Sequence, residues 1–181
     1  MCDKRVSDTY RYSALLEEFG PKLGERRRWL VTGAAGFIGS HLAEALLSAG
    51  QEVVGLDDLS AGYRRNLELA LSGAGGDAEA RFRFIEGSIA DPELCRTACE
   101  GIDFVLHHAA LASVPLSLER PLDFSAVNTE GFVNVLEGAR ARGVRRVVYA
   151  SSSAVYGDDP RLPKSEDMPG RCLSPYALTK A

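Results

Sequence analysis

Three glycines stand between an apolar run and an amphipathic segment, and this arrangement constrains the fold more than any other feature. Residues 28–32 are mostly apolar and end at a glycine, which predicts a buried strand. Residues 33–39, GAAGFIG, follow, and residues 36–49 then repeat apolar side chains with helical spacing up to Gly50. Glycines let the backbone turn tightly and approach a pyrophosphate at the helix N-terminus. The segment therefore predicts a strand, a phosphate-binding turn and a helix.

Strands and helices alternate along the rest of the chain. Further strands are predicted at residues 52–57, 82–86, 104–107 and 146–150. Further helices are predicted at residues 62–71 (followed by a loose connector at 72–76), after the Asp91-Pro92 start, at 123–142 and from Ser174-Pro175. This alternation predicts an α/β fold, a Rossmann-like doubly wound parallel sheet covered on both faces.

The predicted domain spans residues 28–181, and residues 1–27 form an N-terminal helical extension. In that extension Tyr12, Leu15, Leu16 and Phe19 fall on one helical face. Its polar side is not strongly basic, so we expect this face to pack on the body of the protein and not on a membrane.

Composition excludes several classes of function. The formal net charge is −4, which gives no basic footprint for nucleic acid. No apolar stretch approaches the roughly 18 residues that span a membrane, and the polar N-terminus lacks the apolar centre of a secretory signal. We therefore expect a cytoplasmic protein. The four cysteines have no zinc-type spacing, so no metal is expected, and Cys95 and Cys99 are interpreted as small buried apolar residues.

Asp57 ends the second predicted strand, 18 residues after Gly39. An acid at about this offset binds the 2′-hydroxyl of an adenosine ribose and repels a 2′-phosphate. The pattern predicts NAD and not NADP, against the alternative of a tight turn with a helix-capping acid. Arg64 and Arg65 are able to hold a 2′-phosphate, although the solvated start of a helix explains them as well.

Tyr176 and Lys180 are four residues apart on the last predicted helix and are expected to share a face. A nearby ammonium favours the phenolate, which would let Tyr176 accept a proton near neutral pH. Residues 151–153 are three serines directly after the last predicted strand, where the carboxyl ends of parallel strands face the ligand. A hydroxyl there can hold a substrate oxygen and pass its proton, whereas by themselves the serines could form a polar turn.

Four segments, in order, resemble the extended short-chain dehydrogenase/reductase superfamily of NAD-dependent epimerases and dehydratases. They are TGAAGFIGSHL at 32–42, HHAA at 107–110, SSSAVYG at 151–157 and SPYALTK at 174–180. The resemblance implies a catalytic Ser152, Tyr176 and Lys180. The cofactor residues that it implies are Gly33, Gly36, Phe37, Ile38, Gly39, Asp57, Ser60, Gly62, Ser88, Ile89, Ala109, Ala110 and Asn128, together with Tyr176 and Lys180. Ser88 departs from the family, which often has an Asp at this adenine-binding position.

The subfamily depends on Ser153 and Ala154. Nucleotide-sugar dehydratases resemble TDEVYG at this point and use the two acids to eliminate water, whereas this chain has neither acid. The closest likeness is to UDP-N-acetylglucosamine 4-epimerases and UDP-uronic acid relatives, through GLDDLSAG at 55–62, ALASVP at 110–115 and LPK at 162–164. By this likeness Ser113, Ser152 and Ser153 contact the sugar.

The implied activity is NAD-dependent C4 epimerisation of a UDP-sugar through a transient 4-keto intermediate, as used in nucleotide-sugar metabolism and polysaccharide biosynthesis. UDP-N-acetylhexosamines are favoured, then UDP-glucose and UDP-uronic acids. Family members add a C-terminal substrate domain of about 100–150 residues, and Ala181 follows Lys180 directly, so we interpret the chain as part of a longer, homodimeric enzyme and expect these residues alone to be inactive. The competing hypotheses are a dehydratase or reductase of the same superfamily and a non-catalytic NAD-binding module.

Overall fold

The computed structural model of the chain describes residues 18, 20, 23–168 and 170–181. Most of the predicted N-terminal helix, including Tyr12, Leu15, Leu16 and Phe19, lies outside the described residues. Among the described residues, no helix is long and apolar enough to cross a membrane.

One parallel sheet organises the described part of the chain. Its strands are β1 Arg28–Thr32, β2 Glu52–Asp57, β3 Phe82–Glu86, β4 Phe104–His107 and β5 Arg146–Tyr149, in the order β3-β2-β1-β4-β5. Every pairing is parallel, as predicted, and only β5 ends one residue earlier than expected. The chain builds one half of the sheet outward from β1 and then returns to the other side at β4. A ligand crevice is expected at this switch point, outside the carboxyl ends of the strands.

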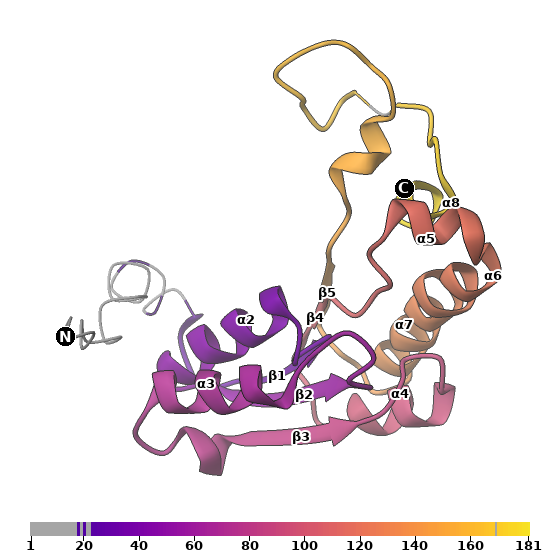
Figure 1. Cartoon of the computed structure of the whole chain (residues 1–181). Coiled ribbons are helices and arrows are strands. Elements are labelled where there is room, and N and C mark those ends of the chain that lie inside the picture. Colours follow the sequence, from indigo (N-terminus) through magenta and orange to yellow (C-terminus); the bar gives the residue numbers. More distant parts are fainter. Residues whose placement is uncertain (1–17, 19, 21–22, 169) are drawn as a thin grey trace, which may run out of the picture.

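Helices cover both faces of the sheet, which confirms the doubly wound arrangement (Figure 1). Helices α2 (Phe37–Ser48) and α3 (Arg64–Ala74) pack together on one face, and α4 (Pro92–Ala98) and α7 (Gly131–Ala141) pack together on the other. Helix α4 begins as predicted, since the Asp91 carboxylate accepts hydrogen bonds from two backbone amides of its first turn.

The core is divided between the two faces by the alternation of strand side chains. Leu30 and Val54 pack towards α4 and α7, whereas their neighbours Val31 and Val53 pack towards α2 and α3. Cys95 and Cys99 lie fully buried in the first of these layers, which confirms their interpretation as small apolar residues. Burial raises the pKa of the Cys95 thiol to about 12 and that of Cys99 to about 11.

The helices differ from the prediction more than the strands do. Helix α3 starts at Arg64 and continues to Ala74, through residues predicted as a loose connector. The short helices α5 (Val114–Glu119), η2 (Ala78–Arg81) and η4 (Ser153–Tyr156) were not predicted.

A continuous helical run occupies the predicted segment 123–142, from Pro121 to Ala141, but it is not one regular α-helix. It consists of α6 (Pro121–Phe124), a π-helix at Ser125–Glu130 and then α7. π-Helical turns are rare in proteins, and those that occur inside α-helices often lie at functional sites. Here the π-helix places Asn128 against the segments that surround the candidate site, as described below.

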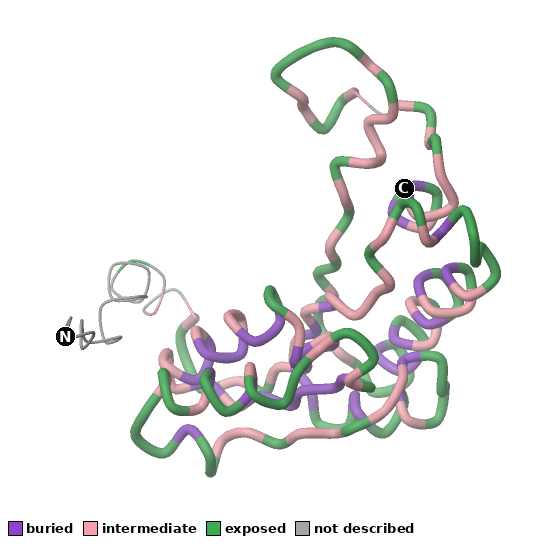
Figure 2. The backbone as a smooth tube through the Cα atoms, viewed as in Figure 1, coloured by how far each residue is buried: buried purple, intermediate pink, exposed green. Residues whose placement is uncertain are grey.

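Beyond β5 the chain leaves the body of the sheet, arches outward and returns at α8 (Pro175–Leu178) (Figure 1). Figure 2 shows buried residues concentrated in the sheet and its flanking helices, and the described residues from 150 to 176 are all intermediate or exposed. Strand β5 is also open to solvent, since Val148 is 49% exposed and Tyr149 is 51% exposed.

Candidate active site

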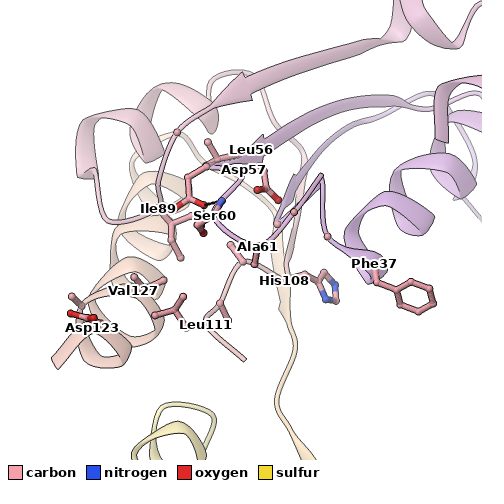
Figure 3. Close-up of a pocket in the computed structure, with 18 of the residues that line it drawn as sticks. Phe37, Leu56, Asp57, Ser60, Ala61, Ile89, His108, Leu111, Asp123 and Val127 are labelled. Atoms are coloured by element: carbon pink, nitrogen blue, oxygen red, sulfur yellow. Dashed lines mark hydrogen bonds between the residues drawn. The ribbon is translucent and has the colours of Figure 1, made fainter. Parts of the chain in front are cut away.

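A cavity of about 510 Å³ lies at the carboxyl ends of β1, β2 and β4, at the predicted switch point (Figure 3). Nine of the predicted cofactor residues line it: Gly33, Gly36, Phe37, Asp57, Ser60, Gly62, Ile89, Ala109 and Ala110. The lining also contains residues that sequence reasoning missed, among them Asp58, His108, Leu111, Arg120, Asp123 and Val127.

The turn at residues 33–39, between β1 and the start of α2 and called the glycine turn below, brings backbone atoms of different segments very close together. Gly33 has φ +69°, and a Cβ placed there would lie 2.7 Å from the backbone nitrogen of Ala109. A Cβ on Gly39 would lie 2.0 Å from the carbonyl oxygen of Gly33. These two positions therefore require glycine. The turn leads into α2 with Gly36 as its N-cap and no side chain over the helix end, so that backbone N–H groups are left for an anion.

The carboxylate of Asp57 ends β2 beside this turn and is only 8% exposed. Its Oδ2 accepts a hydrogen bond from the backbone nitrogen of Ala35 at 2.9 Å, and its Oδ1 accepts one from Leu59 at 2.8 Å. A carboxylate has about four lone-pair sites, so two remain for a ligand. Asp57 thus fixes the glycine turn and can still accept hydrogen bonds from ribose hydroxyls.

Neither of the two arginines considered for a 2′-phosphate, Arg64 and Arg65, lines the cavity. Arg64 forms an ion pair with Glu86 and places its guanidinium 5.5 Å from the centre of the Phe84 ring. Arg65 is exposed on α3, and among the described residues the cavity lining contains neither arginine. The arrangement matches a site built for an unphosphorylated adenosine ribose.

The turn after β3, which was predicted to bind adenine, places only part of its predicted residues at the cavity. Ile89 is 3% exposed and lines the cavity beside Gly87. The Ser88 hydroxyl instead accepts a hydrogen bond from the backbone nitrogen of Ala90 at 3.3 Å, and Ser88 is not part of the lining.

Lys180 is 8% exposed, and its Nζ donates a hydrogen bond over 3.3 Å to the carbonyl oxygen of Ala150, the residue that follows β5. The backbone oxygen of Lys180 accepts a hydrogen bond from Ser151 Oγ at 2.8 Å. Burial lowers the pKa of the Lys180 ammonium. The lysine is therefore fixed beside the serine segment that follows β5.

Tyr176 lies in α8, and Lys180 lies two residues past Leu178, the last residue of that helix. That the two side chains share a face stays a prediction. The Thr179 hydroxyl donates a hydrogen bond to the carbonyl oxygen of Tyr176 at 2.8 Å. The Tyr176 ring meets Phe124 edge-on, with ring centroids 6.3 Å apart.

The serines predicted to contact substrate each take part in local structure. Ser152 Oγ accepts a hydrogen bond from the Ala154 nitrogen at 3.2 Å and caps η4, and Ser113 Oγ caps α5 by accepting one from Leu116. Ser153 is exposed. Several predicted site residues do not line the cavity: Ile38, Gly39, Ser88, Ser113, Asn128, Ser152, Ser153, Tyr176 and Lys180. The structure thus gathers most of the predicted cofactor residues around the cavity and leaves the predicted catalytic residues outside its lining.

Asn128, predicted as a cofactor residue, is 3% exposed, and its side chain faces the protein. Its Oδ1 accepts a hydrogen bond from the Leu111 nitrogen at 2.8 Å, and its Nδ2 donates to the Leu111 oxygen and to Thr179 Oγ1, each at 3.0 Å. Asn128 therefore connects the cavity wall at Leu111 to the segment that carries Tyr176 and Lys180.

Two histidines at the end of β4 complete the region. His107 is 3% exposed, and its Nδ1 lies 2.8 Å from the Thr32 hydroxyl oxygen. Burial, with a smaller contribution from the charge of Lys180, lowers the pKa of His107 to about 4. His108 lines the cavity, and the same two causes lower its pKa. The sequence signal for both was the HHAA segment, in which only the alanines were assigned to the cofactor.

The described residues fit a dinucleotide. A cavity of this volume suits a small-molecule cofactor. Its glycine turn offers backbone N–H groups to a diphosphate, and Asp57 keeps free lone pairs for a ribose. At the side that faces β4, the cavity is lined by His108, Ala109 and Ala110.

Comparison with known proteins identifies a family that uses a dinucleotide cofactor. A family model described as the NAD dependent epimerase/dehydratase family matches residues 29–181. A curated UDP-glucose 4-epimerase from Mycolicibacterium smegmatis is 45% identical over 155 residues, which cover 84% of this chain and 48% of that protein. The chain thus spans about half the length of the curated relatives that it matches.

Solved structures give the same fold. The UDP-N-acetylglucosamine 4-epimerase of Methanobrevibacter ruminantium, in complex with UDP-N-acetylmuramic acid, aligns with a TM-score of 0.76 and 32% identity, over 86% of this chain and 47% of that one. The dTDP-glucose 4,6-dehydratase DesIV of Streptomyces venezuelae, solved with NAD bound, aligns with a TM-score of 0.76 and 38% identity, over 84% and 48%. The family description and the NAD-bound neighbour agree with the cofactor that Asp57 predicts.

Proposed function

Because the chain belongs to the NAD-dependent epimerase/dehydratase family, we propose that the protein carrying it interconverts the C4 epimers of a UDP-sugar. The observation that carries this proposal is the turn after β5, where Ser153 and Ala154 begin η4. Elimination of water needs a proton donor and a base at adjacent carbons, and the residues at these two positions have no carboxyl group. The 45% identical UDP-glucose 4-epimerase supports the same assignment.

The proposed substrates are UDP-N-acetylhexosamines, which the ALASVP segment at 110–115 favours, followed by UDP-glucose and UDP-uronic acids. A UDP-N-acetylglucosamine 4-epimerase is among the structural neighbours, and the curated relatives include several UDP-glucose 4-epimerases. We assign Ser113, Ser152 and Ser153 to contacts with the sugar.

In the proposed mechanism the Tyr176 phenolate accepts the proton of the sugar 4-hydroxyl, and Ser152 bridges the two oxygens. The Ser152 hydroxyl, which accepts from Ala154, retains its own proton to donate. The Lys180 ammonium supplies positive charge beside the serine segment, through its position on Ala150. NAD, when bound, would supply a reversible hydride acceptor for C4. Asp57 and the glycine turn would hold it in place.

The alternative function is a nucleotide-sugar dehydratase, and the similarity to DesIV is the observation that favours it. The two functions give different products from the same substrate class. UDP-N-acetylglucosamine, UDP-glucose and UDP-glucuronate are incubated with the full-length protein and NAD and followed by ¹H NMR. We expect the corresponding C4 epimer in at least one reaction. Accumulation of a 4-keto-6-deoxy sugar would instead establish the dehydratase.

We further propose that the 181 residues alone do not turn over substrate, and that the full-length protein is a cytoplasmic homodimer. The reason is that the chain spans only about half the length of the curated relatives that it matches. Turnover by the purified 181-residue chain at the rate of the full-length protein would contradict the first proposal, and light scattering of the full-length protein tests the second.

A further inference from the structure

Asn66, in helix α3, is neither among the predicted site residues nor used by the proposed mechanism, yet it contacts the middle of the glycine turn. Its side-chain Nδ2 donates a hydrogen bond to the backbone carbonyl oxygen of Ala35 at 2.8 Å, across 31 residues of sequence. A carbonyl oxygen can only accept, so the nitrogen and not the oxygen of the Asn66 amide faces it. This bond joins α3 to the segment that is predicted to hold the diphosphate of NAD.

The carbonyl oxygen of Ala35 has a second donor at the start of α3. The backbone nitrogen of Tyr63, the N-cap residue of that helix, donates to it at 3.0 Å. Gly62 permits this approach, because a Cβ placed there would lie 2.8 Å from the carbonyl carbon of Ala35. Ala35 itself is fully buried. Both lone pairs of its oxygen are therefore used by groups of the protein.

The peptide group between Ala35 and Gly36 is held at both of its ends. The N–H of Gly36 donates to the carbonyl oxygen of Gly33 at 3.1 Å, which closes the glycine turn. In a trans peptide the N–H and the C=O point in opposite directions, so Asn66 holds this group from the side opposite Gly33. The preceding peptide group is fixed through the Ala35 N–H by the carboxylate of Asp57.

The orientation of this peptide group decides which charge the turn presents to a diphosphate. Gly36 lines the cavity and is the N-cap of α2, whose first backbone N–H groups are left for an anion. If the peptide group turned over, the carbonyl oxygen of Ala35 would leave α3 and face the phosphates. Two oxygens that carry no proton cannot form a hydrogen bond, so the turned-over form would repel the diphosphate.

We propose that Asn66 is a positioning residue for the diphosphate of NAD, because its side-chain amide holds the Ala35 carbonyl towards α3 and away from the phosphates. Asn66 does not line the cavity, so it acts through Ala35 and without touching the cofactor. The inference rests on the proposed NAD site. Asp57 holds the neighbouring peptide group and also serves the ribose, whereas the role of Asn66 concerns the diphosphate alone.

The test separates ligands that carry the diphosphate from one that lacks it. Affinities of NAD, ADP and adenosine are measured by NMR titration on the nucleotide-free full-length protein and on Asn66→Ala and Asn66→His. Alanine removes the donor, whereas Nδ1 of histidine lies as many bonds from Cα as Nδ2 of asparagine and can donate in its place.

We expect Asn66→Ala to weaken the binding of NAD and ADP roughly 3- to 10-fold, the value of one hydrogen bond, and to leave adenosine binding unchanged. Asn66→His is expected to restore the affinity for both diphosphates. Equal losses for ADP and adenosine, which a general distortion of the site would produce, would overturn the proposal, as would an unchanged affinity for ADP.

A second measurement uses the wild-type protein and does not depend on the folding of a variant. Coupling is reciprocal, so if the bond from Asn66 strengthens ADP binding, then ADP stabilises that bond by the same factor. The side-chain amide protons of Asn66 should exchange with D₂O roughly 3- to 10-fold more slowly when ADP is bound, and at an unchanged rate with adenosine. Equal slowing by both ligands, or by neither, would contradict the assignment.

Neither measurement uses a sugar nucleotide. A protein that passes both tests but does not epimerise UDP-sugars would remove the proposed function and leave the role of Asn66 intact.

Discussion

The side chain of Asn128 donates a hydrogen bond to the hydroxyl oxygen of Thr179 over 3.0 Å. This bond joins the π-helix to the segment that carries Tyr176 and Lys180. The same amide also pairs with both backbone polar groups of Leu111, which lines the cavity. One buried side chain thus connects the cofactor cavity to the proposed catalytic residues.

Asn128→Ala is expected to lower the free energy of unfolding by about 2–3 kcal/mol, because it leaves the partly buried backbone N–H and C=O groups of Leu111 without their side-chain partner. We also expect kcat to fall, since Thr179 loses the contact that positions α8. Chemical denaturation and steady-state kinetics on the full-length protein measure the two effects.

Asn134→Ala is the matched control, on the same helical run. Asn134 donates only to the carbonyl oxygens of Ile89 and Ala90, in a more exposed setting. Its removal is expected to lower stability by about 1 kcal/mol or less and to leave kcat unchanged. If the two variants behaved alike, Asn128 would have no special positioning role.

Gly33→Ala tests the close approach of the glycine turn to the loop after β4. The new Cβ would lie 2.7 Å from the Ala109 nitrogen, at a residue with φ +69°. We expect a loss of about 2 to 5 kcal/mol in stability, combining the left-handed backbone penalty with overpacking, together with weaker NAD binding.

Gly143→Ala separates these two contributions. Gly143 has the same φ of +69°, but a Cβ there meets nothing within 4 Å. It should lose only about 1–2 kcal/mol and keep its NAD affinity. Thermal and chemical unfolding of both variants measure the difference, and equal losses would show that packing against Ala109 is unimportant.

Asp57 is expected to make NAD bind roughly 10-fold or more tightly than NADP, since a carboxylate facing a 2′-phosphate costs at least about 1.4 kcal/mol. Asp57→Asn should narrow this ratio. Asp77→Asn is the control. It changes an exposed carboxylate at the start of η2, before β3, and should leave the ratio of NAD to NADP affinity unchanged. Calorimetric titration measures both affinities, and tighter binding of NADP would direct attention to Arg64 and Arg65.

His107 gives the protein a defined acid sensitivity. Its pKa is about 4 in the folded state and 6.5 in the unfolded chain, so below pH 6.5 the unfolded state binds a proton that the folded state does not. The contribution of the neutral His107 ring to the free energy of unfolding is fully present above pH 6.5. It falls by about 3 kcal/mol as the pH drops to 4. Urea denaturation across this range should show a shallower pH dependence in His107→Asn than in the wild type. An identical slope would contradict the buried neutral state.

The strands were predictable because each is a short apolar run bounded by turn residues, and four of the five have the predicted bounds. Glycine spacing and Asp57 located the cofactor cavity for a similar reason, since both follow directly from backbone geometry at a strand end. Helix α5 carried a usable signal in Ser113 followed by Pro115, an N-cap serine with proline in the first turn, which sequence reasoning passed over.

Other features depend on contacts between distant parts of the chain. Apolar spacing at 123–142 does not distinguish an α-helix from one interrupted by π-turns. Asn128, in the π-helix, bonds Leu111 and Thr179, which lie 17 and 51 residues away in the sequence and whose nearness only the fold shows.

The central claim, hydride transfer at C4 with return to the same carbon, is tested most directly by following an isotope. The full-length protein is incubated in ordinary water with a UDP-hexose that carries deuterium at C4, and the products are analysed by NMR. The account predicts the C4 epimer with the deuterium retained at C4. Exchange of the deuterium with solvent, or its transfer to C6 of a 4-keto-6-deoxy product, would contradict it.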